Sequence, residues 1–116
     1  MADSPTDMEP PQSRAEQELE RLDRIFAALA HRQRRQILLI IQFRGARLTA
    51  SQIAGRFSCA WPTTSRHLRV LKHAGLVNVE ARGRERIYSL NNDLMAGTLA
   101  GWLAWFEDEE KAQAFK

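Results

Sequence analysis

The sequence predicts a small, mostly helical α+β domain in which four helices precede a β-hairpin and one further helix follows it. Apolar residues recur at helical spacing in four stretches before residue 76 and again after residue 91. Between them, residues 77–90 alternate apolar and polar side chains on both sides of a glycine, the pattern of two short strands and their turn. A length of 116 residues is that of one domain.

Three regions of the chain differ in composition. Residues 1–13 hold three prolines among acidic and polar residues, so we expect a flexible acidic tail. The periodic segments predict a folded domain over residues 14–108, followed by a polar C-terminal end over residues 109–116. No segment has the length of an apolar membrane span, and the N-terminus lacks a signal-peptide pattern. We therefore expect a cytoplasmic protein without a membrane partner.

Two helices are expected before a break at Gly45. The first begins at Arg14, and the second covers "HRQRRQILLIIQF". Their inward stripes are Leu19, Leu22, Ile25, Phe26 and Leu29 in the first helix and Ile37, Leu38 and Ile41 in the second. Arg32, Arg34 and Arg35 lie in the first turn of the second helix, where the helix dipole disfavours cations. A nearby phosphate would offset this cost.

The next two helices are a short one and a longer one. Thr49 and Gln52 have the spacing of a capping box, which predicts a short helix over residues 50–57. After a tight corner, a longer helix is expected over residues 60–74, with Gly75 as its C-terminal cap. A short helix, a turn and a longer helix form the helix-turn-helix arrangement, whose second helix enters the major groove of DNA.

The two faces of the helix over residues 60–74 differ in chemistry. At about 100° per residue, Thr64, Leu68 and Leu71 fall together and are expected to be buried. Arg66 and Arg69 point the opposite way, where Arg66 can reach a base edge or a phosphate and Arg69 is better placed for phosphate. The first turn carries short hydroxylated side chains, which let a groove floor approach it closely.

The hairpin and the last helix complete the predicted fold. Arg82, Arg84 and Arg86 gather at the hairpin turn, which favours a wing over residues 77–90 that lies along the DNA backbone or reaches into a minor groove. An ordinary solvent-facing hairpin is the alternative. The last helix takes its cap from residues 91–93. One of its faces carries Met95, Leu99, Trp102, Leu103 and Phe106.

Positive charge is concentrated in the middle of the chain. Residues 24–90 carry thirteen of the seventeen Lys and Arg residues and only two acids, whereas both ends are acidic. This distribution favours a polyanionic partner over a merely solvated surface. Together with the helix-turn-helix it predicts double-stranded DNA as the partner.

Four stretches resemble signature segments of the ArsR family of winged helix-turn-helix repressors: "FAALAHRQRRQILLII", "LTASQIAGRF", "SRHLRVLKHAGLV" and "ARGRERIYSL". The resemblance covers about residues 20–106. It implies a homodimeric repressor that binds an imperfect palindrome, with its recognition helices in successive major grooves. Carried over by position, the groove-facing residues are Trp61, Pro62, Thr63, Ser65 and Arg66. The family histidine is matched by His67, which is expected to pack partly buried.

The resemblance also implies a dimer interface built from the first and last helices. The residues expected there are Leu19, Leu22, Phe26, Leu99, Trp102 and Phe106. A small-ligand pocket is the alternative use of the aromatic residues in the last helix. Two departures from the family pattern stand out: Trp61 replaces a residue that is often Gln, and "LAHRQR" replaces "LADPTR", which adds His31 and Arg32.

No metal sensor or enzyme is predicted. Cys59 is the single cysteine, the last helix has no histidine, and His31, His67 and His73 lie in three different contexts. Cys59 is expected to be a small buried residue, with a redox-reactive thiol as the alternative. Neither a phosphate-binding glycine motif nor a nucleophile with a base is evident, so we expect no catalysis and no cofactor. The alternative functions are a winged-helix protein–protein module, which has little reason to keep the arginines, and a thiol- or metal-responsive sensor of the same fold.

Overall fold

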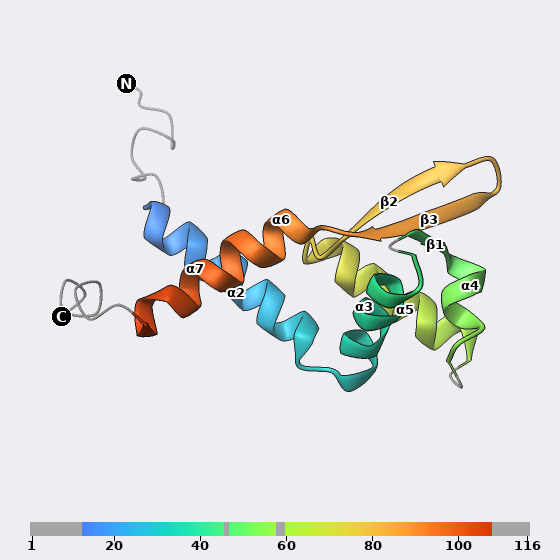
Figure 1. The fold of residues 1–116 in the computed structure, drawn as a ribbon, viewed down its shortest axis with the longest axis horizontal. Helices are drawn as coiled ribbons and strands as arrows, with labels where there is room; N and C mark the ends of the chain where they lie inside the picture. Colours follow the sequence, from blue (N-terminus) through green and yellow to red (C-terminus); the bar gives the residue numbers. More distant parts are fainter. Residues whose placement is uncertain (1–12, 46, 58–59, 108–116) are drawn as a thin grey trace, which may run out of the picture.

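The computed structural model describes residues 13–45, 47–57 and 60–107. Its elements follow the predicted order with one addition, a short strand after the second helix (Figure 1). They are α2 Arg14–Leu29, α3 Arg32–Phe43, β1 Arg47–Thr49, α4 Ala50–Ala54, α5 Trp61–His73, β2 Val77–Arg82, β3 Glu85–Leu90, α6 Asn92–Leu94, η1 Met95–Leu99, α7 Ala100–Leu103 and η2 Ala104–Phe106. The last four elements form one helical run over residues 92–106, called the terminal helix below. Cys59, residues 1–12 of the predicted tail and residues 109–116 lie outside the described residues.

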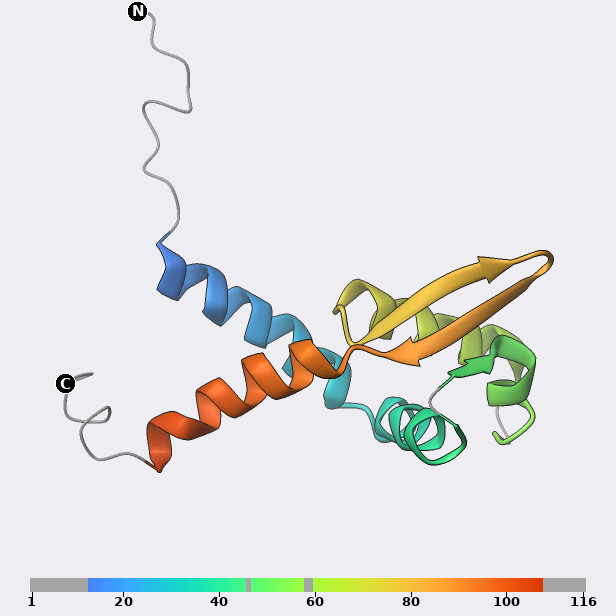
Figure 2. The ribbon, with the colours of Figure 1, turned by 45° about the horizontal axis from the view of Figure 1, so that its top comes forward.

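The two ends of the molecule are formed by different secondary-structure elements. Helix α2 and the terminal helix lie together at one end, and the hairpin tip, α4 and the start of α5 lie at the other (Figures 1 and 2). Helix α3 and the remainder of α5 connect the two ends. The predicted recognition helix and wing are therefore separated from the predicted dimer helices.

The helix N-caps that the sequence predicts for α4 and for the terminal helix are present in the structure. Thr49 Oγ1 accepts from the Gln52 amide at 3.1 Å and Gln52 Oε1 accepts from the Thr49 amide at 2.8 Å, which confirms the capping box. Asn91 caps the terminal helix, since its side chain accepts from the Leu94 amide at 3.2 Å. Helix α4 ends at Ala54, before the predicted residue 57, because Gly55 has low helix propensity and the chain continues in tighter turns.

Strand β1 was not predicted from the sequence, which indicated only a break in this region. Its residues pair antiparallel with β3, and Leu48 lies opposite Tyr88. The sheet order is β1-β3-β2. A three-residue strand is too short to show a period, and its stability comes from hydrogen bonds to a strand about 40 residues later in the chain. The pairing of Thr49 with Ile87 places the start of α4 beside the middle of β3.

The end of α5 is fixed by a Schellman motif. The Gly75 amide donates to the Lys72 carbonyl at 2.9 Å, and the Leu76 amide donates to the Leu71 carbonyl at 3.0 Å. Gly75 has φ of 81°, a left-handed conformation that suits glycine. Asn91 holds the same turn, because its side-chain amide donates to the Gly75 carbonyl at 3.0 Å. The C-terminus of α5 is thereby tied to the start of the terminal helix.

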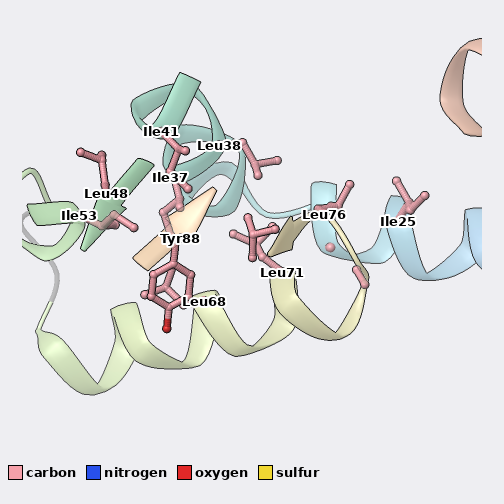
Figure 3. Close-up of a cluster of buried hydrophobic side chains, with 13 residues drawn as sticks. Ile25, Ile37, Leu38, Ile41, Leu48, Ile53, Leu68, Leu71, Leu76 and Tyr88 are labelled. Atoms are coloured by element: carbon pink, nitrogen blue, oxygen red, sulfur yellow. The ribbon is translucent and has the colours of Figure 1, made fainter. Parts of the chain in front are cut away.

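The hydrophobic core lies between the C-terminal half of α2, helices α3, α4 and α5, and the sheet (Figure 3). Its fully buried members include Ile37 and Ile41 of α3, Ile53 of α4 and Leu71 of α5. Tyr88 adds the contribution of β3, at the centre of the sheet. This core fixes the recognition helix against the sheet that carries the wing. None of the described helices has the length and apolar character that crossing a membrane requires.

Candidate nucleic-acid interface and helical groove

Helix α5 divides its side chains between core and solvent as its spacing predicts. Thr64 is 2% exposed and Leu68 and Leu71 are buried, which confirms the predicted inward face. Arg66 and Arg69 are exposed on the outer side of the helix. In the first turn, Trp61 and Pro62 are exposed, whereas Thr63 and Ser65 are half-buried along the flanks.

Four exposed arginines on α5 and the hairpin have no acidic partner within the part of the chain that the structure describes. Among the described residues, the ion pairs join Arg21 to Glu18, Arg47 to Glu80 and Arg82 to Glu80. Arg66 and Arg69 on α5, and Arg84 and Arg86 on the hairpin, take part in none of them. Their guanidinium groups can therefore bind phosphate without first breaking an internal ion pair.

The three wing arginines do not share one face of the hairpin. Side chains alternate along a strand, so Arg86 lies on the same face as Tyr88, the face turned toward the core. Arg82 lies on the opposite face, where its Nε is 3.8 Å from a carboxylate oxygen of Glu80. Gly83, whose φ is 61°, and Arg84 form the two-residue turn between β2 and β3. The sequence grouped all three, but the strand register separates Arg82 from the others.

A concavity of about 520 Å³ lies between the recognition helix and the wing. Trp61 and Ser65 line it from α5, and Arg84 and Arg86 line it from the hairpin. The hydroxyl-bearing Thr49 and Ser51 at the start of α4, among other residues, complete the wall. Trp61, which is 50% exposed, thus forms one wall of a polar hollow whose charged lining residues are Arg84, Glu85 and Arg86. Its place in the sequence did not indicate this position.

A second hollow, an apolar groove of about 640 Å³, lies between α2 and the terminal helix. Leu19 and Leu22 line it from α2, facing Gly97, Gly101, Trp102 and Phe106 of the terminal helix, among others. The ring of Trp102 stands edge-on to Phe26 at 5.2 Å between centroids and to Phe106 at 5.0 Å. We call this surface the aromatic groove.

The residues predicted for the dimer interface divide into two groups. Leu22 is 6% exposed, and Leu99 packs half-buried against the core, so both stabilise the fold of a single chain. The other four are exposed, from 36% for Trp102 to 72% for Phe106. Trp105, which the sequence placed beside this face, and Leu103 are exposed as well. Exposed apolar side chains gathered in this way form a candidate interaction surface.

Two histidines that the sequence placed in different contexts are in contact. The rings of His31 and His67 lie 4.5 Å apart between centroids, so the expected separation is wrong for this pair. His67 is 6% exposed, as expected of a packing residue. Burial, and then repulsion from His31, Arg34 and Arg66, lowers the pKa of His67 below its ordinary value of 6.5. Among the described residues, no group of three or more His, Cys, Asp or Glu side chains could hold a metal ion.

The arginines at the start of α3 are partly used within the fold. Arg34 donates to the carbonyls of Ala27 and Ala28, and Arg35 donates to the carbonyl of Leu29 at 2.6 Å. These carbonyls belong to the last turn of α2, the negative end of that helix. The C-terminus of α2 therefore offsets the charges of Arg34 and Arg35, a role for which the sequence had suggested a nearby phosphate.

Comparisons with known proteins match the chain to DNA-binding regulators. A family model described as a helix-turn-helix domain matches residues 29–80. The transcriptional repressor SdpR of Bacillus subtilis (strain 168) is 31% identical over 85 residues, which cover 73% of this chain and 91% of SdpR.

Two solved structures extend the similarity to the fold. An ArsR-like transcriptional regulator from Rhodococcus sp. RHA1 is 27% identical with a TM-score of 0.70, covering 83% of this chain and 89% of that one. The homodimeric winged helix-turn-helix DNA-binding domain of Mb0332 from Mycobacterium bovis, a possible ArsR-family regulator, is 27% identical with a TM-score of 0.63. That match covers 85% of this chain and 92% of the Mb0332 fragment.

Proposed function

This chain belongs to the ArsR family of winged helix-turn-helix transcriptional regulators, and we propose that it is a cytoplasmic, homodimeric repressor that binds an imperfect palindrome in double-stranded DNA. The observation that carries the proposal is the arrangement of Arg66, Arg69, Arg84 and Arg86. They come from helix α5 and from the hairpin, they are exposed, and they have no acidic partners among the described residues. A winged-helix module that binds only proteins has little use for such a set.

The proposed contacts follow from where each side chain lies. Helix α5 enters the major groove, with Trp61, Pro62, Thr63 and Ser65 nearest the base edges. Arg66 reads a base edge or binds a phosphate, and Arg69 binds a phosphate. In the wing, Arg84 and Arg86 face the DNA beside α5. Arg82 has a smaller share, because it lies on the opposite face of the hairpin near Glu80.

The hollow between α5 and the wing suggests a role for Trp61. An indole cannot make the paired hydrogen bonds that a glutamine makes to adenine. Beside Arg84 and Arg86 it can instead pack on a deoxyribose while the guanidinium groups bind the flanking phosphates. This arrangement gives affinity and shape recognition in place of a hydrogen bond to a base.

The aromatic groove is the proposed dimer contact. Two copies of the exposed surface formed by Leu19, Phe26, Trp102 and Phe106 would cover each other across a twofold axis. The homodimeric state of Mb0332 and the repressor activity of SdpR support a dimeric repressor here.

Selection of bound duplexes from a random pool, followed by a salt titration on the selected sequence, tests the proposal. The selected sites are expected to form an imperfect palindrome. With six to eight phosphates contacted by the two protomers, a plot of log association constant against log salt should have a slope of about −5 to −7. A flat salt dependence, or no enrichment of any sequence, would contradict DNA recognition.

A further inference from the structure

A polar junction connects three helices at the base of the recognition helix. Arg34 donates from Nε to the Ala28 carbonyl at 2.7 Å and from Nη2 to the Ala27 carbonyl at 3.1 Å, both in the last turns of α2. Its third nitrogen, Nη1, lies 3.3 Å from Nδ1 of His67 in the middle of α5. One planar guanidinium at the start of α3 thus bonds to α2 and α5 together.

The chemistry of arginine fixes the protonation of this junction. A guanidinium only donates hydrogen bonds, so Nδ1 of His67 must be the acceptor and carries no proton. The proton of the neutral ring is then on Nε2, which donates to Oε1 of Gln33 at 2.8 Å. His67 is nearly buried, so both ring nitrogens need these partners. Gln33 and Arg34 therefore hold the imidazole in one tautomer and one orientation.

We propose that Arg34 is a positioning residue for DNA reading, which sets the orientation of α5 relative to α2. The inference rests on the proposed function, in which α2 belongs to the dimer contact and α5 reads the DNA. Arg66 and Arg69 lie on either side of His67 along α5, so a change of orientation at His67 moves both of them. Side-chain tips lie about 5–6 Å from a helix axis, so a rotation of about 20° displaces them by about 2 Å. That exceeds the tolerance of a hydrogen bond to a base edge.

The chain contains a matched control for this role. Arg35 donates to the Leu29 carbonyl at the same end of α2, but no hydrogen bond between Arg35 and α5 occurs in the described residues. Arg34→Lys and Arg35→Lys both keep the positive charge at the end of α2. A lysine has one nitrogen in place of a planar fork, so only Arg34→Lys breaks the link to α5.

The experiment measures the affinity of each dimer for the selected duplex and for an unrelated duplex. The proteins compared are wild type, Arg34→Lys, Arg35→Lys, His67→Leu and the double variant Arg34→Lys/His67→Leu. Arg34→Lys and His67→Leu are each expected to lower the ratio of specific to nonspecific affinity by about tenfold, and the double variant by no more than either alone. Arg35→Lys is expected to keep the wild-type ratio. Circular dichroism checks that every variant is folded under the conditions of the assay.

His67→Asn provides the rescue and a second route to the answer. Its Oδ1 stands close to the position of Nδ1 and can accept from Arg34, so its specificity ratio should stay near that of wild type while His67→Leu loses it. The comparison of His67→Asn with His67→Leu tests the positioning role of Arg34 even if Arg34→Lys does not fold. Equal ratios for Arg34→Lys and Arg35→Lys, multiplicative losses in the double variant, or equal ratios for His67→Asn and His67→Leu would overturn the positioning role. Failure of the proposed function looks different, since wild type itself would then show no sequence preference.

Discussion

Arg66 and Arg84 carry the same charge on elements that, in the proposed complex, meet DNA in different ways. Arg66 projects from the outer face of α5, and Arg84 occupies the turn at the tip of the hairpin. We expect Arg66→Ala to lower the affinity for the selected site by about 1–3 kcal/mol and to relax base preference at one position of each half-site. The measurement is a competition assay with single-base variants of the site.

Arg84→Ala should instead weaken binding to all sequences alike, because a contact to phosphate carries no sequence information. Since both protomers lose the contact, the salt slope should become shallower by about 2. Arg82→Ala, on the opposite face of the hairpin, is the comparison and should have a smaller effect. If neither Arg66→Ala nor Arg84→Ala alters binding, the DNA lies on another surface.

His67 makes the stability of the domain depend on pH. Because its pKa is lowered in the folded chain, the unfolded chain binds the proton more readily. The free energy of unfolding should therefore fall as the pH drops through 6.5 and level off below the folded-state pKa, with the full contribution present at higher pH. Urea denaturation of wild type and His67→Asn across this range measures the effect. A pH dependence identical in the two proteins would assign it to other groups.

The sequence predicts a residue's environment well where the neighbours lie on the same helix. The burial of Thr64, Leu68 and Leu71 follows from spacing alone, and the structure confirms it. The contact between His31 and His67 joins positions 36 residues apart and has no local signal. The placement of Trp61 in a hollow depends in the same way on a hairpin that comes later in the chain.

Among the connections between elements, the turn after α5 is closely packed and held by hydrogen bonds. A Cβ on Gly75 would lie 2.9 Å from Cδ2 of Leu94, at a φ that other residues rarely adopt. Gly75→Ala is expected to lower the free energy of unfolding by about 1–2 kcal/mol from the left-handed backbone alone, with an additional loss because Leu94 must move. Gly83→Ala is the control, since it also has a positive φ but nothing within 4 Å of the new methyl group. Chemical denaturation should show the larger loss for Gly75→Ala, and equal losses would contradict a role for the contact with Leu94.

Helices whose ends are fixed by neighbouring residues could be predicted from the sequence. Strand β1, which is held by pairing with a distant strand, could not. The capping box, the Schellman glycine and the Asn91 cap each fix a helix end through residues within one turn. Strand β1 has three residues and depends on β3 for its hydrogen bonds. Helix α4 ends three residues before the predicted end, a difference of less than one turn, because sequence patterns do not define helix ends to the residue.

At the scale of the whole molecule, the two ends have separate tasks in the proposed function. Trp102→Ala removes the ring that contacts both Phe26 and Phe106, so we expect the dimer to dissociate in analytical ultracentrifugation. Phe43→Ala is the control, because Phe43 is 77% exposed on α3 and does not line the aromatic groove. A Trp102→Ala protein that remains fully dimeric would place the dimer contact elsewhere.

The aromatic groove is exposed in a single chain, and this affects how the amount of DNA-bound dimer depends on the concentration of the protein. If most chains are monomeric at low expression, the concentration of dimers rises with the square of the concentration of chains. Occupancy of the regulated promoter would then change more steeply than the protein level does. The rings that line the groove would thus set the expression threshold at which transcription of the regulated gene is switched off.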